Sequence, residues 1–161
     1  MSIAPIIGQN WGAGRFDRVD SALKTAYWFA LGWGLFSFIV LVTAGPVALT
    51  WISDDPEVVV AATAHLSILP IGMGLMGVIA IATSSFNALG RPKPPLMISV
   101  IQMLCLSVPF ALIGNEWFGY VGILWGSVAS IFVTAGLSFF WLRISIKPEE
   151  TLISSDARTA S

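Results

Sequence analysis

The sequence predicts an all-α integral membrane protein with four membrane-spanning helices, and three observations lead to that fold class. Hydrophobic residues make up 56% of the 161 positions and charged residues only 11%, whereas an ordinary soluble domain carries about 25% charged residues. The apolar residues gather in four long runs, and none of these runs contains Asp, Glu, Lys or Arg. A helix needs roughly 17–25 such residues to cross the hydrocarbon core of a bilayer.

The four helices are expected at residues 26–52, 56–89, 95–113 and 119–143. An uninterrupted apolar run in lipid must satisfy its own backbone hydrogen bonds, which a helix does and an isolated strand does not. A short cytoplasmic segment precedes the first helix. Residues 148–161 are mostly polar and are expected to form a disordered cytoplasmic tail.

Prolines mark the start of one helix and irregularities in two of them. Asp55 followed by Pro56 predicts an N-cap and the first helical position of the second helix. Pro70, with Gly72 just behind it, predicts a kink and a hinge in that helix, because proline lacks a backbone donor. Pro109 predicts the same in the third helix.

Small residues recur every fourth position in the fourth helix, at Gly122, Gly126 and Ser130. This spacing predicts a face on which another helix packs closely. The single cysteine, Cys105, lies in the apolar run of the third helix. It is expected to be a small buried hydrophobic residue and not a nucleophile.

The basic residues predict the orientation of the chain in the membrane. All eight Lys and Arg residues lie before the first apolar run, between the second and third runs, or after the fourth run, which ends at Leu142. The two other loops, at residues 53–57 and 114–117, contain no Lys or Arg. The positive-inside rule therefore predicts that both termini are cytoplasmic.

No pattern in the sequence indicates an enzyme, a metal centre or a nucleic-acid partner. The glycine-rich stretch at residues 8–14 lacks the Gly-Lys-Ser/Thr ending of a phosphate-binding loop. One histidine and one cysteine are too few ligands for a metal cluster. We expect no catalytic activity and no cofactor.

Four side chains are candidates for a substrate cavity. Gln102 is the polar side chain that is most costly to bury, and either an interhelical hydrogen bond or a substrate contact would satisfy it. Asn87 lies near the cytoplasmic end of the second helix. Trp33 and Trp125 lie deeper than the other tryptophans, which form an interfacial belt. His65 is expected to be interfacial and not a proton relay.

Two segments resemble the multidrug and toxic compound extrusion (MATE) family. Residues 4–15, APIIGQNWGAGR, resemble the motif that ends one helix of the C-terminal lobe and turns through the cytoplasm into the next. Residues 87–92, NALGRP, resemble the family's next cytoplasmic turn. The resemblance implies that the matched glycines shape these turns and that the arginines anchor the topology. The matched residues are Gly8, Gln9, Gly12, Gly14, Arg15, Gly90 and Arg91.

The family's transporters have twelve helices in two lobes. The resemblance implies that residues 1–147 correspond to part of the C-terminal lobe, from the end of the family's helix eight to its helix twelve. The chain then begins inside a helix, and the missing N-terminal lobe is an expected partner. The implied substrates are small organic cations or drugs, exchanged for protons or sodium across the bacterial inner membrane. Residues 66–89 contain no Asp, Glu or Tyr, so no coupling residue is carried over. Alone, such a part is expected to be inactive, because alternating access moves one bundle against another.

Two alternatives remain at this point. A complete small transporter that works as an oligomer would resemble the four-helix small multidrug resistance proteins, but the membrane-embedded Glu expected near their start is absent here. A structural or assembly protein of the membrane is favoured only by the lack of charges within the helices.

Overall fold

The computed structural model describes residues 3–52 and 55–159, with side chains through residue 146. These residues form helices joined by short turns, with no strand among them. The elements are the α-helices α1 (Ala4–Gly12), α2 (Phe16–Ile52), α3 (Pro56–Ile68), α4 (Met73–Ala88), α5 (Lys93–Val100) and α6 (Val108–Thr159), the 3-10 helix η1 (Leu69–Gly72) and the π-helix η2 (Ile101–Ser107).

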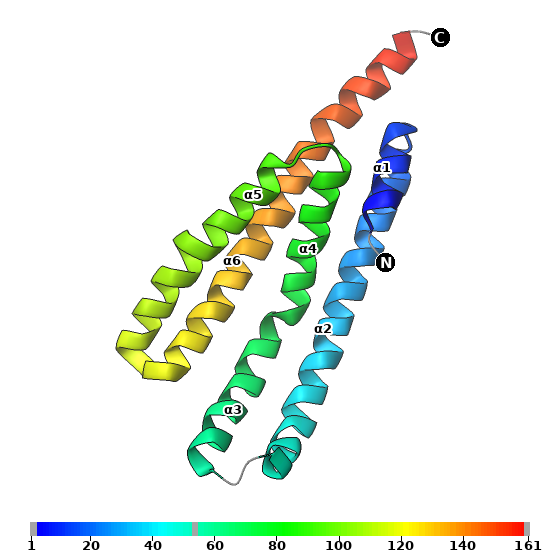
Figure 1. Cartoon of the computed structure of the whole chain (residues 1–161). Helices are drawn as coiled ribbons and strands as arrows, with labels where there is room; N and C mark the ends of the chain where they lie inside the picture. The colour runs from blue at the N-terminus through cyan, green and yellow to red at the C-terminus, as the bar shows by residue number, and fades with distance from the viewer. Residues whose placement is uncertain (1–2, 53–54, 160–161) are drawn as a thin grey trace.

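The helices form an antiparallel bundle in which one column lies centrally (Figure 1). The column of α3, η1 and α4 packs against α2 on one side and against α6 on the other. The segment α5–η2 packs along α6. The short helix α1 contacts α2 and α4 at the end of the bundle where the N- and C-terminal segments also lie.

Three stretches of the described residues are long and apolar enough to cross a membrane: Phe16–Ile52, Pro56–Ala88 and Lys93–Ile146. The third stretch folds back on itself in Figure 1, at Gly119, whose φ of 60° and ψ of −140° are not helical. It therefore supplies two antiparallel crossings, and the described residues have four in total. The all-α membrane fold expected from the sequence is confirmed.

The helices extend beyond the apolar runs at both ends of the chain. The helix α2 begins at Phe16, ten residues before the apolar run expected at residue 26, so its first turns carry charged residues as well. The helix α6 continues to Thr159, where the sequence led us to expect disorder from residue 148 onward. Residues 149–158 include Glu, Leu, Ala and Arg, which are strong helix formers, and a helix can therefore propagate past Pro148.

The start of α3 has the expected cap. The backbone N–H of Glu57 donates to Oδ1 of Asp55 at 2.9 Å, and Pro56 occupies the first helical position. A capping side chain and a proline with a preset φ together fix the point at which the chain re-enters a helix. This prediction is confirmed.

The two prolines within helices have different effects. At Pro70 the chain tightens into the 3-10 turn η1, which separates α3 from α4. Near Pro109 the irregularity lies one turn earlier, in the π-helix η2. Pro109 has no N–H to donate to the carbonyl of Cys105, four residues earlier. The regular α-helical hydrogen-bond pattern is therefore interrupted there. Cys105 itself is exposed on η2, so the expectation that it is buried was wrong; in this fold it faces outward with its apolar neighbours.

Buried residues form one large cluster toward the end with the chain termini and a smaller one toward the other end. The large cluster comprises Ile7, Val19, Leu23, Tyr27, Val78, Ala82, Phe86, Ile98, Ala135 and Leu142. The smaller cluster comprises Ile68, Leu124 and Val128. Most other large apolar side chains face outward, and Trp51 is 88% exposed. Such a surface is stable only in an apolar solvent, in keeping with a lipid-embedded bundle.

The small-residue face of the fourth crossing packs closely against the third, as expected. A Cβ atom on Gly122 would overlap the backbone of Gly114, and one on Gly126 would overlap the backbone of Phe110. One turn further on, the hydroxyls of Ser130 and Ser107 lie 3.0 Å apart and are hydrogen-bonded. Small residues thus let the two backbones approach, and a pair of serines ties them together.

Candidate functional site

Two turns at the same end of the bundle have the same backbone geometry. After α1, Gly14 has a φ of 69°; its N–H donates to the carbonyl of Trp11 at 3.0 Å, and the N–H of Arg15 donates to the carbonyl of Asn10 at 2.8 Å. This is a Schellman cap, in which a glycine in the left-handed region ends the helix.

The second cap follows α4. Gly90 has a φ of 70°, its N–H donates to the carbonyl of Asn87 at 3.1 Å, and the N–H of Arg91 donates to that of Phe86 at 2.9 Å. Each of the two turns therefore carries a Gly-Arg pair in equivalent positions. Adding a Cβ at Gly14 or Gly90 would meet no atom within 4 Å, so backbone conformation is what requires glycine there.

The two turn motifs lie side by side because α1 packs against the end of α4. A Cβ atom on Gly8 would lie 3.5 Å from the carbonyl oxygen of Ala88, and Ile7 is fully buried. Gln9 and Gly12 are exposed. The motif at residues 4–15 thus has one face that packs and one face that points away from the bundle.

The closest approach of α2 and α4 lies beside the 3-10 turn. A Cβ atom on Gly34 would overlap the backbone of Gly74, and one on Gly77 would come within 2.8 Å of the Cβ atom of Ala30. On the other side of the central column, a Cβ atom on Gly72 would lie 3.0 Å from Cδ1 of Ile131 on α6. Glycines therefore let η1 and α4 lie tightly between α2 and α6.

A groove between α2 and α4 holds one of the predicted cavity residues. Its volume is about 440 Å³, and Trp33 and Phe29 line it together with the hydroxyl-bearing residues Ser37 and Ser84. The rings of Phe29 and Trp33 are stacked with centroids 6.2 Å apart. The ring centroid of Phe36 lies 5.5 Å from that of Trp33. These three rings form an aromatic row along α2, and flat aromatic faces stack favourably on other flat aromatic groups.

The other predicted cavity residues lie elsewhere. Trp125 lines a separate groove of about 360 Å³ near the hairpin of the third and fourth crossings, together with Phe110 and Trp117. Asn87 is exposed at the end of α4. Gln102 is half-buried on η2, and no hydrogen bond joins its side chain to another described residue; the interhelical hydrogen bond of this segment is made by Ser107. The structure does not gather the four candidates into one site.

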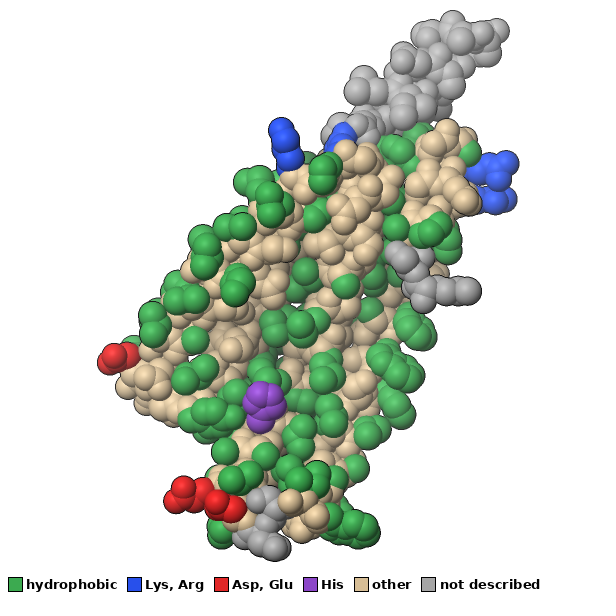
Figure 2. Space-filling view, in the orientation of Figure 1, with side chains coloured by type: hydrophobic (Ala, Val, Ile, Leu, Met, Phe, Trp, Pro, Cys, Tyr) green, Lys and Arg blue, Asp and Glu red, His purple; other side chains and the backbone are tan. Residues whose placement is uncertain are grey.

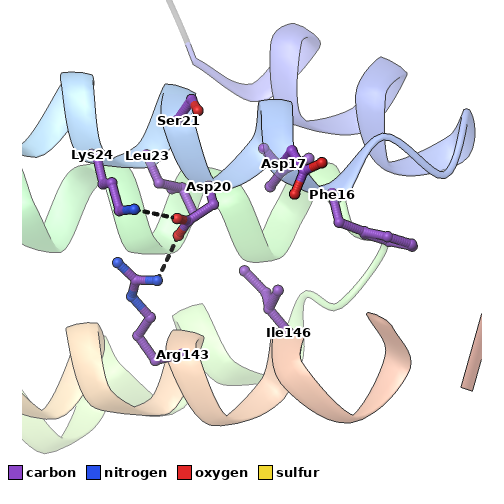
Figure 3. Close-up of a pocket in the computed structure, with 9 residues that line it drawn as sticks. Phe16, Asp17, Asp20, Ser21, Leu23, Lys24, Arg143 and Ile146 are labelled. Carbon is purple, nitrogen blue, oxygen red and sulfur yellow. Dashed lines mark hydrogen bonds and ion pairs between the residues drawn. The ribbon is translucent and has the colours of Figure 1, made fainter. Parts of the chain in front are cut away.

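An ionic cluster joins α2 and α6 toward the end of the bundle where the chain termini lie (Figure 3). Nη1 of Arg143 donates to Oδ1 of Asp20 at 2.6 Å, and Nζ of Lys24 lies 2.7 Å from Oδ2 of the same carboxylate. The cluster lines a pocket of about 390 Å³ between the two helices. It was not predicted, because Asp20 and Arg143 are 123 residues apart and no local pattern connects them.

An aromatic pair lies next to this cluster. The guanidinium of Arg143 lies 5.4 Å from the centre of the Phe139 ring, and the ring of Tyr27 meets Phe139 edge to face at 5.3 Å. Tyr27 is only 8% exposed, and its hydroxyl has no hydrogen-bond partner among the described residues. A buried hydroxyl without a partner is unusual in a folded protein.

The charges separate along the bundle, as Figure 2 shows on one face. On this face, Lys and Arg side chains lie at the end where the chain termini are, and the visible Asp and Glu side chains lie at the opposite end. Asp17 and Asp20 of α2 belong to the basic end, where Asp20 pairs with Lys24 and Arg143. His65 is exposed on α3, between the two ends. Among the described residues, no group of three or more His, Cys, Asp or Glu side chains could hold a metal ion.

Comparison with known proteins agrees with this architecture. The sequence model of the MatE family matches residues 1–113. The chain is 30% identical over 123 residues to the FAD transporter of Shewanella oneidensis, covering 76% of this chain and 27% of that protein. It is 25% identical over 138 residues to the multidrug export protein MepA of Staphylococcus haemolyticus, covering 86% of this chain and 30% of that protein.

A solved structure shows the same fold. The MATE transporter VcmN of Vibrio cholerae in its bent form superposes with a TM-score of 0.87 at 23% identity, over 93% of this chain and 34% of that one. The chain therefore spans about a third of the length of the proteins that it matches.

Proposed function

The chain belongs to the MatE family of membrane transporters, and from this we propose that it forms part of the C-terminal lobe of an efflux antiporter for drugs or organic cations. The rest of such a transporter, including the N-terminal lobe, is its partner. In this arrangement both termini face the cytoplasm, since the basic ends lie together.

The groove beside Trp33 is the observation that carries this proposal. It combines the stacked rings of Phe29 and Trp33 with the hydroxyls of Ser37 and Ser84, and it lies between α2 and α4. Cationic aromatic compounds are held by ring faces through stacking and cation–π attraction, so they need no carboxylate here. We propose that Trp33 faces the substrate path, with Phe29 as its stacking partner.

The turn η1 supplies the flexibility that the proposal needs. Pro70 and Gly72 interrupt the helical ladder midway along the central column, and local 3-10 segments within helices often mark hinges. We propose that α3 and α4 bend at this point during transport, and that Pro109 with η2 gives a second, weaker hinge.

The coupling ion acts on another part of the transporter in this proposal. The four apolar runs contain no Asp, Glu, Lys or Arg, and ion-coupled transporters usually keep an ionisable group within the membrane. We propose that a group in the missing part binds the proton or sodium ion. The isolated chain would then be inactive, because it lacks both this group and the second bundle.

A complementation experiment tests the proposal. The chain is expressed with the part of the Shewanella oneidensis relative that precedes the matched region, in bacteria without endogenous drug pumps, and ethidium efflux is measured. We expect efflux from the pair and none from either part alone. Efflux from this chain alone would instead favour a self-sufficient oligomeric transporter, and no efflux from any combination would count against a transport role.

Trp33→Ala within the active pair tests the groove. Loss of one stacking partner should slow efflux roughly three- to tenfold. The matched control is Trp28→Ala, because Trp28 lies on the same helix and is 77% exposed but does not line the groove. Equal effects of the two substitutions would remove the groove from the proposal.

A second substrate class follows from one relative. The protein with 30% identity is a FAD transporter, and the planar ring system of a flavin would stack on the same aromatic row. Flavin fluorescence in the medium of cells that express the active pair tests this candidate. Export of FAD without export of ethidium would assign the groove to flavins instead of organic cations.

A further inference from the structure

The third crossing turns different faces toward the bundle before and after η2. After η2, the backbone of Gly114 lies against that of Gly122 on the fourth crossing, and Ser107, the last residue of η2, is hydrogen-bonded to Ser130. Before η2, the fully buried side chain is that of Ile98. Ile98 precedes Ser107 by nine residues, or about two and a half α-helical turns, so a continuous α-helix would place these two side chains on opposite sides.

The π-helix η2, at residues 101–107, accounts for this change of face. A π-helix closes its hydrogen bonds over five residues instead of four, so each residue turns the chain less than it does in an α-helix. Over the length of η2 the difference adds up to about one residue position, or about 100° of rotation about the helix axis. This rotation brings Ile98 from the far side of the helix toward the bundle, where it joins the large buried cluster.

The side chains that a continuous α-helix would place against the fourth crossing face outward instead. Met103, Val100 and Leu96 precede Ser107 by about one, two and three α-helical turns, and they are 70%, 46% and 67% exposed. These side chains are large and apolar, and they suit a helix contact as well as a lipid contact, because lipid tails are as apolar as a protein core. The third crossing therefore carries a second face that fits the fourth.

Gln102 opposes an exchange of these two faces. Its side chain is half-buried in the structure. If residues 101–107 were α-helical, Gln102 would lie about 140° around the helix from Ser107 and would turn toward lipid. Polar side chains within a membrane almost always face the interior of the bundle. The cost of moving the amide outward therefore offsets the gain of a regular α-helix at η2.

We propose that η2 is a register switch of the third crossing. In the observed form, the π-helix holds Ile98 and Gln102 toward the bundle. In the second form, residues 101–107 are α-helical, α5 is rotated about its own axis, and Val100 and Met103 contact the fourth crossing. The amide of Gln102, predicted above as a substrate contact, is offered on the outer face only in this second form. The switch is a rotation and not a bend, so it goes beyond the hinge proposed above for this segment.

A spin label at residue 100 reports the register in the full chain. Val100→Cys is made in a Cys105→Ser background, so that it carries the only thiol, and the nitroxide-labelled protein is reconstituted in lipid vesicles. Oxygen dissolves preferentially in the hydrocarbon, and its collision rate with the nitroxide, measured by electron paramagnetic resonance, shows whether the label faces lipid. Leu112→Cys is the matched control, because Leu112 lies after η2 on the same crossing and is 63% exposed.

Pro109→Ala should turn the label at residue 100 away from lipid. The alanine supplies the N–H that the carbonyl of residue 105 lacks, and one backbone hydrogen bond is enough to shift a two-state equilibrium about fivefold, here toward the α-helical form. We expect the oxygen collision rate to fall at Val100→Cys and to stay the same at Leu112→Cys. An unchanged rate at Val100→Cys, or an equal fall at both positions, would overturn the switch.

Deletion of Leu104 distinguishes a change of register from a general loosening of the helix. A continuous α-helix with one residue fewer turns α5 back by about 100°, so that residue 100 faces outward again. Added to Pro109→Ala, the deletion should return the oxygen collision rate at Val100→Cys to that of the parent protein. A rate that stays low in the folded double variant would contradict a rotation by one residue position.

Gln102→Leu tests the opposing cost. Without the amide, nothing polar is moved outward in the second form, so the oxygen collision rate at Val100→Cys should fall as it does with Pro109→Ala. A rate equal to or above that of the parent would remove Gln102 from the switch. Circular dichroism shows whether each variant is folded, and if the deletion variant is not, Gln102→Leu decides the question. Because these measurements use a spin label and not efflux, the switch and the transport proposal can fail independently.

Discussion

The backbones of Gly34 on α2 and Gly74 on α4 are in contact: a Cβ atom on Gly34 would overlap the backbone of Gly74, and one on Gly74 would lie 3.3 Å from Cα of Leu31. This contact lies just beyond the 3-10 turn at Pro70. Close backbone contact at small residues is a main source of helix association in lipid, where the solvent is as apolar as the side chains. The crossing therefore fixes α4 on α2 next to the point where the central column is least regular.

Gly34→Ala should destabilise the bundle. Its Cβ would overlap the Gly74 backbone, which cannot move without the whole of α4, and overpacking of this kind costs about 1–3 kcal/mol. Thermal unfolding of the purified chain in detergent, followed by circular dichroism, measures the loss. Gly32→Ala on the same helix is the control, since its Cβ would meet nothing within 4 Å; a matching loss in both variants would show that the crossing is not the cause.

Gly90→Ala and Gly12→Ala should have opposite effects, although both glycines belong to the turn motifs. Gly90 has a φ of 70°, and an alanine there would be strained by roughly 1–2 kcal/mol. Gly12 ends α1 with a helical backbone and open space around it, so alanine should be neutral or slightly stabilising. Unfolding midpoints of the two variants check this, and a destabilising Gly12→Ala would mean that this glycine has a role outside the turn.

The hydrogen bond between Ser107 and Ser130 should be measurable as a coupling energy. Ser130 also donates to the carbonyl of Ser127 at 2.8 Å, so Ser107 is the donor of the interhelical bond. A double-mutant cycle of Ser107→Ala and Ser130→Ala should give a coupling of about 0.6 kcal/mol, a typical value for polar pairs between membrane helices. Among the described residues, the Ser99 hydroxyl donates only to the carbonyl of Pro95 in its own helix, and the same cycle between Ser99→Ala and Ser130→Ala should give no coupling.

The features that the sequence predicted are those with a local cause. Asp55 caps α3 because its side chain accepts from the backbone N–H of Glu57 two residues on, and Pro70 tightens the chain because it lacks a donor. The face of Gly126 and Ser130 follows from helical spacing alone. The family resemblance at the two Gly-Arg turns also has a local cause, since Gly14 and Gly90 adopt the same left-handed conformation.

The features that the sequence did not predict depend on pairs that are distant in the chain. Nothing near Asp20 indicates Arg143, and nothing near Gly34 indicates Gly74, because each contact is set by how whole helices pack. The buried state of the Tyr27 hydroxyl likewise depends on Phe139, on another helix. Gln102 was expected to form an interhelical hydrogen bond or a substrate contact. The interhelical hydrogen bond of this segment is made by Ser107 with Ser130 of α6, and a substrate contact of Gln102 stays a prediction.

The central claim is that four apolar crossings place the basic ends of the bundle in the cytoplasm, and site-specific labelling in cells tests it most directly. Single cysteines are introduced by Glu57→Cys, Glu116→Cys, Arg18→Cys or Lys93→Cys in a Cys105→Ser background, and intact cells are treated with a membrane-impermeant maleimide. We expect the two glutamate positions to react in intact cells and the two basic positions to react only after permeabilisation. Labelling of Glu57→Cys and Lys93→Cys from the same side of the membrane would contradict the account.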